Sequence, residues 1–159
     1  MRLIYGDLFD SKEMYLCHQC NCKTKRAAHL AAAVFEKYPY ADIYHERAVR
    51  DDPELSKPGN IIIRGDPKND KRYVLAMLAQ VWPGKPKFPK STRDGFDARK
   101  ELFQVCLDKM RLLHPDASFA FPWGIGCGAA GGKWGQYQDM LINFEKQSGC
   151  PVVVYKLES

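Results

Sequence analysis

The sequence contains no long apolar run and no apolar leader. Its 159 residues include no stretch of about eighteen consecutive apolar side chains, so we expect no membrane-spanning helix. The segment 1–13 becomes acidic before it could form the apolar core of a signal peptide. We therefore expect a cytoplasmic protein, or a nuclear one in a eukaryote, that does not bind a membrane.

The cysteines lack the spacing of a complete zinc site. Cys17 and Cys20 have C-x-x-C spacing, but no second C-x-x-C and no H-x-x-x-H pair follows to supply the remaining ligands. Without an export signal, free thiols are the expected state, and Cys17 is expected on a buried strand. We predict no metal and no cofactor. A zinc-stabilised module built on CHQCNC at 17–22 is kept as an alternative.

The charge balance is basic, with a formal net charge of +5. Cationic side chains gather in two short segments: Lys23, Lys25 and Arg26, and then Lys85, Lys87, Lys90 and Arg93. Such clusters are typical of solvated faces, and they also attract polyanions or phosphorylated ligands. Neither cluster is interleaved with aromatic residues in a known nucleic-acid motif. A nucleic-acid-binding module is therefore only an alternative function.

Strands alternate with helices along the chain. Short apolar or β-branched runs predict strands at 2–5, 15–19, 61–63, 73–78, 118–121 and 152–155. Apolar residues at helical spacing predict helices at 26–37, 41–50, 96–113 and 134–145. The proline- and lysine-rich stretch 82–92 is predicted to be a loop. This alternation indicates one α/β domain over 1–159, with helices on both faces of a largely parallel sheet.

The most informative motif is the glycine-rich segment 121–134, FPWGIGCGAAGGKW, between a predicted strand and a predicted helix. Five of the nine residues 124–132 are glycines, so successive backbone amides can turn inward around an anion. The amino end of the following helix adds partial positive charge, which suits a diphosphate. The segment is neither a Walker A motif nor a Rossmann fingerprint.

Two further constellations follow the first two predicted strands. HQCN at 18–21 places amide side chains that can donate and accept at once, which suits a ribose diol. GDLF at 6–9 places a carboxylate that can accept a hydrogen bond from an adenine amino group, although Asp7 is also a common turn former. In parallel α/β sheets, ligands bind at the carboxyl ends of the strands.

The order of GDLF, HQCN and GIGCG resembles the macrodomain family over nearly the whole chain. It is most similar to the branch that includes the terminal ADP-ribose glycohydrolase and the macrodomain of the DNA-targeting antitoxin. The resemblance implies a three-layer α/β/α sandwich with a mixed, mostly parallel sheet and an ADP-ribose cleft. It places the adenine near Asp7 and Leu8, the distal ribose near Asn21, and the phosphates on residues 126–129. The expected binding residues are Asp7, Leu8, Gln19, Asn21, Ala28, Gly124, Ile125, Gly126, Cys127, Gly128, Ala129, Ala130 and Tyr155.

Three positions depart from the pattern of the family. Its first ligand loop usually carries glycines, where this chain has Ala27-Ala28-His29. The carboxylate of the glycohydrolase branch falls at Ala130 and its lysine at about Gln80, so the lysine-plus-aspartate mechanism is not expected to transfer.

Other side chains could replace that mechanism. Asn21 and His29 are the candidate catalytic residues, and the imidazole of His29 is of a type that titrates near neutral pH. His18, Asp94 and a Cys127 activated by oriented amides are weaker candidates, each with an equally good structural role. Tyr155 or Phe9 could stack on a purine, and Trp82 could close over the ligand or anchor its loop.

The sequence thus predicts an ADP-ribose-binding macrodomain that hydrolyses an ADP-ribosyl linkage or ADP-ribose 1″-phosphate. The alternative is a reader that binds ADP-ribose without turnover. The expected partners are ADP-ribose or an ADP-ribosylated protein or nucleic acid, and the expected state is a monomer.

Overall fold

A computed structural model, which describes residues 1–158, contains a six-stranded mixed sheet. The strand order is β1-β6-β5-β2-β4-β3. The strands are β1 Arg2–Tyr5, β2 Tyr15–Gln19, β3 Ile61–Asp66, β4 Lys71–Met77, β5 Phe119–Pro122 and β6 Val152–Lys156. Every neighbouring pair is parallel except β3 and β4, which are antiparallel. The expectation of a mixed, mostly parallel sheet is confirmed.

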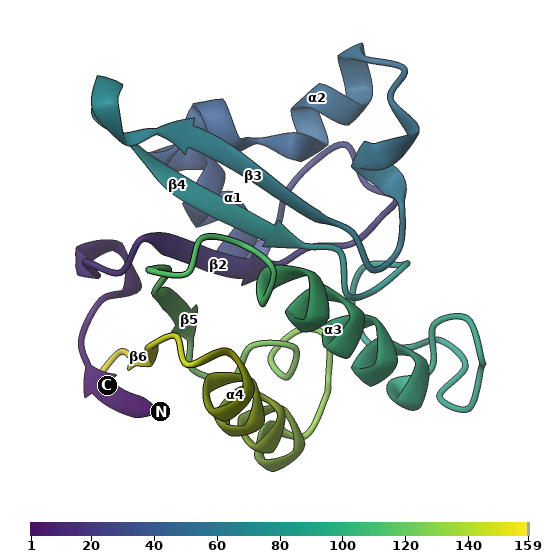
Figure 1. Ribbon diagram of the computed structural model, residues 1–159. Helices are drawn as coiled ribbons and strands as arrows, with labels where there is room; N and C mark the ends of the chain where they lie inside the picture. The colour runs from purple at the N-terminus through teal and green to yellow at the C-terminus, as the bar shows by residue number, and fades with distance from the viewer. Residues whose placement is uncertain (159) are drawn as a thin grey trace.

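Helices cover both faces of this sheet, which gives the α/β/α sandwich predicted from the sequence (Figure 1). The helices α1 His29–Lys37 and α2 Ile43–Val49 lie on one face. The helices α3 Phe96–Met110 and α4 Trp134–Ser148 lie on the other. Short 3-10 turns η1 Leu8–Asp10, η2 Pro39–Ala41, η3 Pro53–Ser56 and η4 Pro67–Asn69 connect the elements.

Each face of the sheet has its own hydrophobic core, because successive residues of a strand point to opposite sides. Cys17, Leu75 and Phe121 belong to the core under α3 and α4. The alternate residues, such as Leu16 and Ala120, belong to the core under α1 and α2. Cys17 is buried on a strand, as predicted.

Several predicted boundaries were wrong by a few residues, mainly at helix starts. Residues 26–28 were predicted as helix, but α1 begins only at His29. Asp42 accepts a hydrogen bond from the backbone N–H of His45 and so caps α2, which begins later than predicted. The strand β3 extends past Ile63 to Asp66, because β4 begins early enough to pair with it.

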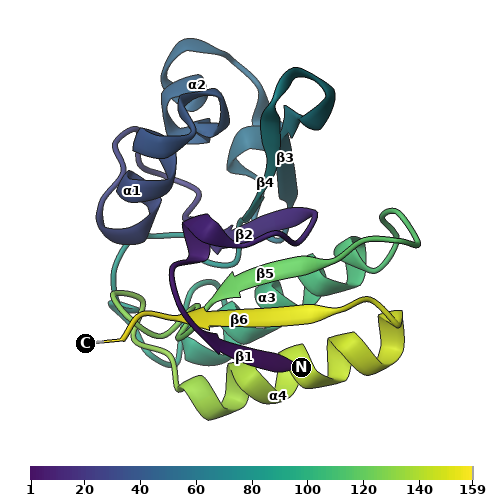
Figure 2. The same ribbon diagram turned by 90° about the vertical axis from the view of Figure 1, so that its left-hand side faces the viewer.

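The carboxyl ends of β1, β5 and β6 point to the same edge of the sheet, on the left in Figure 2. The segment after β5 and the start of α1 both lie at this edge. The fold therefore brings the predicted motifs, which are far apart in sequence, to one side of the molecule. Among residues 1–158, no helix is both long enough and apolar enough to cross a membrane.

Candidate ligand-binding cleft

Two adjoining pockets lie along this edge of the sheet. The first pocket, of about 360 Å³, is lined by residues from the β2 end, the α1 start, segment 80–84 and the glycine loop (residues 123–132). The second, of about 400 Å³, is lined by the segment after β1 and the end of β6. Leu30, Pro122 and Trp123 line both pockets, so the two pockets adjoin, and their junction lies at these residues.

The glycine loop lines the first pocket with residues whose backbone amides are unpaired. Tight turns fold it: Cys127 N donates to Gly124 O at 2.8 Å, and Gly132 N donates to Gly126 O at 3.0 Å. Gly124 and Gly126 have φ of 78°, a left-handed conformation that favours glycine. Within the described residues, the amides of Gly126, Gly128 and Ala129 donate no backbone hydrogen bond. This arrangement is typical of an anion-binding loop.

The amino end of α1 faces the same pocket. Ala28, His29, Leu30 and Ala31 line it, and no side chain caps this helix end, so its first N–H groups are free to meet a ligand. The sequence instead indicated the amino end of the helix after the glycine loop. That expectation was wrong in its detail, because no residue of α4 lines the pocket.

The turn after β2 fixes the side chain of Asn21. Its Nδ2 stays without a hydrogen-bond partner among the described residues. Oδ1 of Asn21 accepts hydrogen bonds from the backbone N–H groups of Lys23 and Thr24, each at 2.9 Å. Its own N–H donates to the Tyr44 hydroxyl at 2.8 Å, and Arg47 donates to the carbonyls of Asn21 and Thr24. We expected the Asn21 side chain both to donate and to accept, but the turn occupies its acceptor Oδ1. The donor Nδ2 makes no hydrogen bond among the described residues and is available to a ligand.

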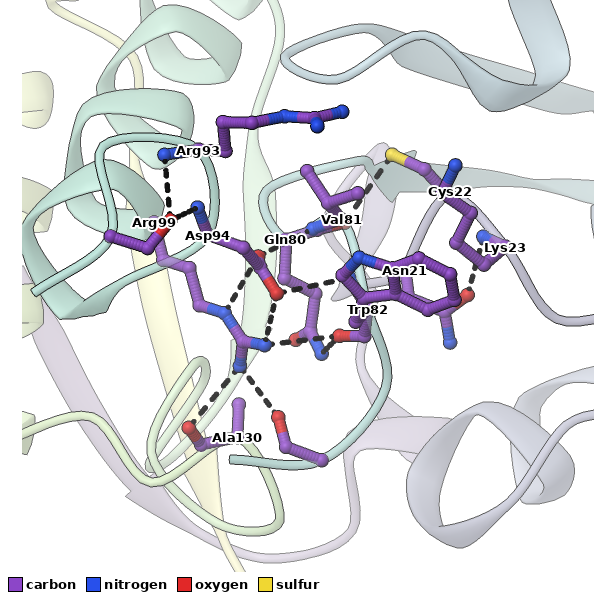
Figure 3. Close-up of polar contacts among 12 residues, drawn as sticks. Asn21, Cys22, Lys23, Gln80, Val81, Trp82, Arg93, Asp94, Arg99 and Ala130 are labelled. Atoms are coloured by element: carbon purple, nitrogen blue, oxygen red, sulfur yellow. Dashed lines mark hydrogen bonds and ion pairs between the residues drawn. The ribbon is translucent and has the colours of Figure 1, made fainter. Parts of the chain in front are cut away.

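A buried ion pair holds two walls of the first pocket together (Figure 3). Arg99, only 2% exposed, donates to Asp94 through Nε at 3.0 Å and through Nη2 at 2.8 Å. The same guanidinium donates to the carbonyls of Trp82, Gly84 and Ala130. Asp94 also accepts from the amides that follow Gln80, at Val81 and Trp82. Asp94 is thus occupied by hydrogen bonds within the chain and lines neither pocket, so its place as a weaker catalytic candidate was wrong.

The second pocket contains the residues predicted to meet an adenine. Asp7, Leu8 and Tyr155 line it, and Oδ1 of Asp7 accepts from the N–H of Phe9 at 2.9 Å. The Tyr155 hydroxyl donates to Glu13 at 2.5 Å, which fixes the ring as a wall. Lys156 also lines this pocket.

Solved structures share this architecture over the whole chain. A protein of unknown function from Bacteroides thetaiotaomicron gives a TM-score of 0.74 at 23% identity, over 98% of this chain and 97% of its own. The macrodomain of Mycobacterium tuberculosis DarG gives a TM-score of 0.70 at 17% identity, over 99% of this chain and 98% of its own. Thermosipho africanus DarTG in complex with ADP-ribose gives 0.72 at 17% identity, over 97% of this chain and 40% of that one. The chain has the macrodomain fold. No protein-family model matches the sequence, and no curated protein matches it.

The first pocket of this macrodomain fold carries one formal charge, which is positive. Arg26 lines the pocket, and none of the lining residues is a carboxylate. Cys127 lines it too, but burial raises the pKa of its thiol to about 11, so the amides do not activate it as the sequence analysis considered. The pocket is therefore suited to an anionic ligand and holds no carboxylate to act as a general base.

His18 is excluded as a catalytic candidate by its position. It is 1% exposed, lies outside both pockets and packs edge-on against Phe35. Burial lowers the pKa of its imidazole to about 4, so it is neutral at physiological pH. His29, in contrast, is exposed, lines the first pocket and has a φ of 56°.

The two positions that differ from the glycohydrolase branch have structural roles here. The Ala130 carbonyl accepts from Arg99 at 3.4 Å. The Gln80 amide accepts from Gln19 at 2.7 Å and donates to the Trp82 carbonyl at 2.8 Å. Gln80 thus connects the β2 end to the loop that begins at Trp82. Trp82 is 56% exposed and does not line the pocket, where we considered that it could cover a ligand.

The structure brings together the predicted residues in two groups. Gln19, Asn21, Ala28, His29 and residues 124–130 line the first pocket, and Asp7, Leu8 and Tyr155 line the second. Sequence analysis missed Thr24, Arg26, Tyr44 and Trp123. Arg26 could have been inferred from its basic cluster, and Trp123 from its place before the glycine loop. Tyr44 gave no signal, because its role depends on the packing of α2 against the β2 end.

The cysteine-rich segment does not form a cluster of metal ligands. Cys17 and Cys20 belong to the cores on opposite faces of the sheet. Among residues 1–158, no group of three His, Cys, Asp or Glu side chains is placed to hold a metal ion.

Proposed function

We propose that this protein binds one ADP-ribose molecule across the two adjoining pockets. The observation that carries the proposal is that the unpaired amides belong to Gly126, Gly128 and Ala129, which line the same pocket as the uncapped amino end of α1. These groups suit a diphosphate. The second pocket, with Asp7 and Tyr155, suits the adenine at one end of the ligand. Nδ2 of Asn21 then donates to a hydroxyl of the distal ribose.

The geometry favours binding without turnover over hydrolysis. Hydrolysis requires a group that activates water or stabilises a developing charge. The first pocket has no carboxylate among its lining residues, and the Cys127 thiol is protonated at neutral pH. Gln80, at the position of the branch's lysine, is occupied by two hydrogen bonds within the chain. We therefore propose a reader of free or attached ADP-ribose.

Hydrolysis is a second candidate because of one residue. His29, at the start of α1, lines the first pocket beside the proposed ribose site. An imidazole there would act as a general base toward water at the distal ribose. Asn21 would then orient the ribose hydroxyl.

Calorimetric titration with ADP-ribose tests the proposed binding. We expect single-site binding of ADP-ribose, with weaker binding of ADP and AMP, because these lack the distal ribose. Absence of heat at millimolar ADP-ribose would contradict the proposal. Asn21→Ala should weaken ADP-ribose more than AMP, because only ADP-ribose reaches the first pocket in full.

Release of ADP-ribose from modified protein or DNA, and of phosphate from ADP-ribose 1″-phosphate, separates the reader from the hydrolase. We expect no turnover. If turnover occurs, His29→Gly is the informative variant, because glycine adopts the φ of 56° at this position without the strain that alanine would carry. His45→Ala, on the exposed face of α2, is the matched control. Turnover that survives His29→Gly would exclude the imidazole as the base.

A further inference from the structure

The junction of the two pockets contains a cation held on an aromatic ring. Nζ of Lys156 lies 4.1 Å from the centre of the Trp123 ring, within the range of a cation–π contact. Trp123 lines both pockets, and Lys156 lines the second. The ammonium group therefore lies near the point where a ligand crosses from one pocket to the other.

The ring that carries this cation is itself held in place. The backbone N–H of Trp123 donates to the Tyr155 carbonyl at 2.8 Å, which continues the pairing of β5 with β6. The Trp134 ring packs against the Trp123 ring with centroids 5.4 Å apart. Even so, Trp123 stays 41% exposed, so its side chain is a fixed but accessible platform.

Among residues 1–158, Lys156 has no carboxylate partner. It is only partly exposed, and the ion pairs of the described residues do not include it. Asp7 lines the same pocket without pairing with it. A partly desolvated ammonium without a counter-ion favours an anion that enters the cleft.

We propose that Lys156 is a phosphate-binding residue that neutralises the diphosphate of the ligand at the junction of the pockets. This inference rests on the proposed function, since that function sends a diphosphate through the junction. Arg26 lines the first pocket, but the glycine loop and the α1 start themselves offer only neutral amides and partial charge. Lys156 adds a full charge and makes affinity depend on the number of phosphates and on salt.

The cation also separates ligands by charge. Affinity should fall from ADP-ribose to ligands with one phosphate and further to adenosine, and salt should weaken the phosphorylated ligands most. Trp123 contributes by holding the ammonium over the junction rather than in bulk water. An arginine can stack on the same ring and bind the same phosphate, so Lys156→Arg should preserve binding.

Calorimetric titration of the full chain with ADP-ribose, adenosine and inorganic pyrophosphate tests the inference. For Lys156→Gln we expect about tenfold weaker ADP-ribose binding, the size of one charge-assisted hydrogen bond near the surface. Its adenosine affinity should be unchanged, and its salt dependence should be flatter. Lys68→Gln, which changes an exposed lysine outside both pockets, is the matched control and should bind like the parent. Thermal unfolding checks that both variants remain folded.

The outcomes separate this inference from the proposed function. If the parent binds ADP-ribose and Lys156→Gln binds it equally well at low salt, the Lys156 assignment is wrong and the proposed function stands. If the parent binds no ADP-ribose, the proposed function fails, and pyrophosphate then decides: binding that requires Lys156 supports a phosphate site at the junction. Equal pyrophosphate binding by the parent and Lys156→Gln, or no pyrophosphate binding by the parent, overturns the inference.

Discussion

At the scale of single residues, the cleft depends on backbone conformations that few side chains allow. A Cβ at Gly126 would lie 2.7 Å from Cε1 of Tyr137, and the φ of 78° disfavours any L side chain. At His29 a residue with a side chain adopts a positive φ of 56°. It belongs to the loop in which macrodomains usually carry glycines. For a residue with a Cβ, such a conformation costs about 1–3 kcal/mol and persists where the surrounding structure imposes it.

Gly126→Ala tests the conformation of the glycine loop. We expect it to lower the free energy of unfolding by about 2 kcal/mol, through strain and the clash with the Tyr137 ring, and to weaken ADP-ribose binding. Gly135→Ala, in the first turn of α4, is the control, since a Cβ there meets nothing within 4 Å. Urea unfolding measures both, and an unchanged Gly126→Ala midpoint would contradict the assignment of strain.

Cys127 should behave as an unactivated thiol. Burial raises its pKa to about 11, so at neutral pH almost all of it is protonated. Alkylation by iodoacetamide, followed by peptide mass spectrometry, should be slower than for a free cysteine and should accelerate about tenfold per pH unit. A rate that reaches a plateau near neutral pH would indicate a thiolate and would revive a nucleophilic role.

At the scale of elements, segment 80–84 is fixed to the start of α3 by one ion pair. Asp94 lies just before α3, while Trp82 and Gly84 belong to the loop after β4. Arg99 bonds to Asp94 and to both loop carbonyls, and the same guanidinium reaches the glycine loop at Ala130. The walls of the first pocket therefore share one buried anchor.

Asp94→Asn should destabilise the protein by about 3 kcal/mol, because it leaves the buried Arg99 without its counter-ion. Asp97→Asn is the control: it also removes an ion pair of α3, but the Asp97 side chain is 92% exposed, so little change is expected. Equal unfolding midpoints for the two variants would show that the anchor contributes little.

The same pair makes stability depend on pH in one direction. Burial raises the pKa of Asp94, but hydrogen bonds from Arg99 and from two backbone amides outweigh it, so the pKa lies below its ordinary value. The stabilisation is therefore fully present above the unfolded pKa of aspartate and is lost as pH falls through the folded one. Unfolding followed from neutral to strongly acidic pH should show a smaller acid loss for Asp94→Asn than for the parent.

Element types could be predicted better than the contacts between elements. The strands at 15–19 and 152–155 were visible because their apolar runs end at turn residues, and both are present with nearly these bounds. The start of α1 was misplaced, because alanine-rich residues 26–28 have high helix propensity that the turn around Asn21 overrides. The Arg99 anchor could not be predicted, since its partners at Trp82 and Ala130 are distant in sequence.

At the scale of the whole molecule, parallel topology explains why distant motifs share one cleft. The β1, β2 and β5 ends carry GDLF, HQCN and the glycine loop to one edge of the sheet, where parallel sheets bind ligands. The motif order was sufficient to predict this arrangement. The roles of the individual residues stay predictions, because they depend on how a ligand lies in the cleft.

The central claim is that one ADP-ribose molecule occupies both pockets at once. Titration of the isotopically labelled protein with ADP-ribose, followed through backbone amide resonances, tests it most directly. We predict that amides of Gly126–Ala129 and of Asp7–Phe9 shift together along one single-site curve, since these segments line the first and second pockets. Shifts confined to one segment, or no shifts at millimolar ADP-ribose, would contradict the claim.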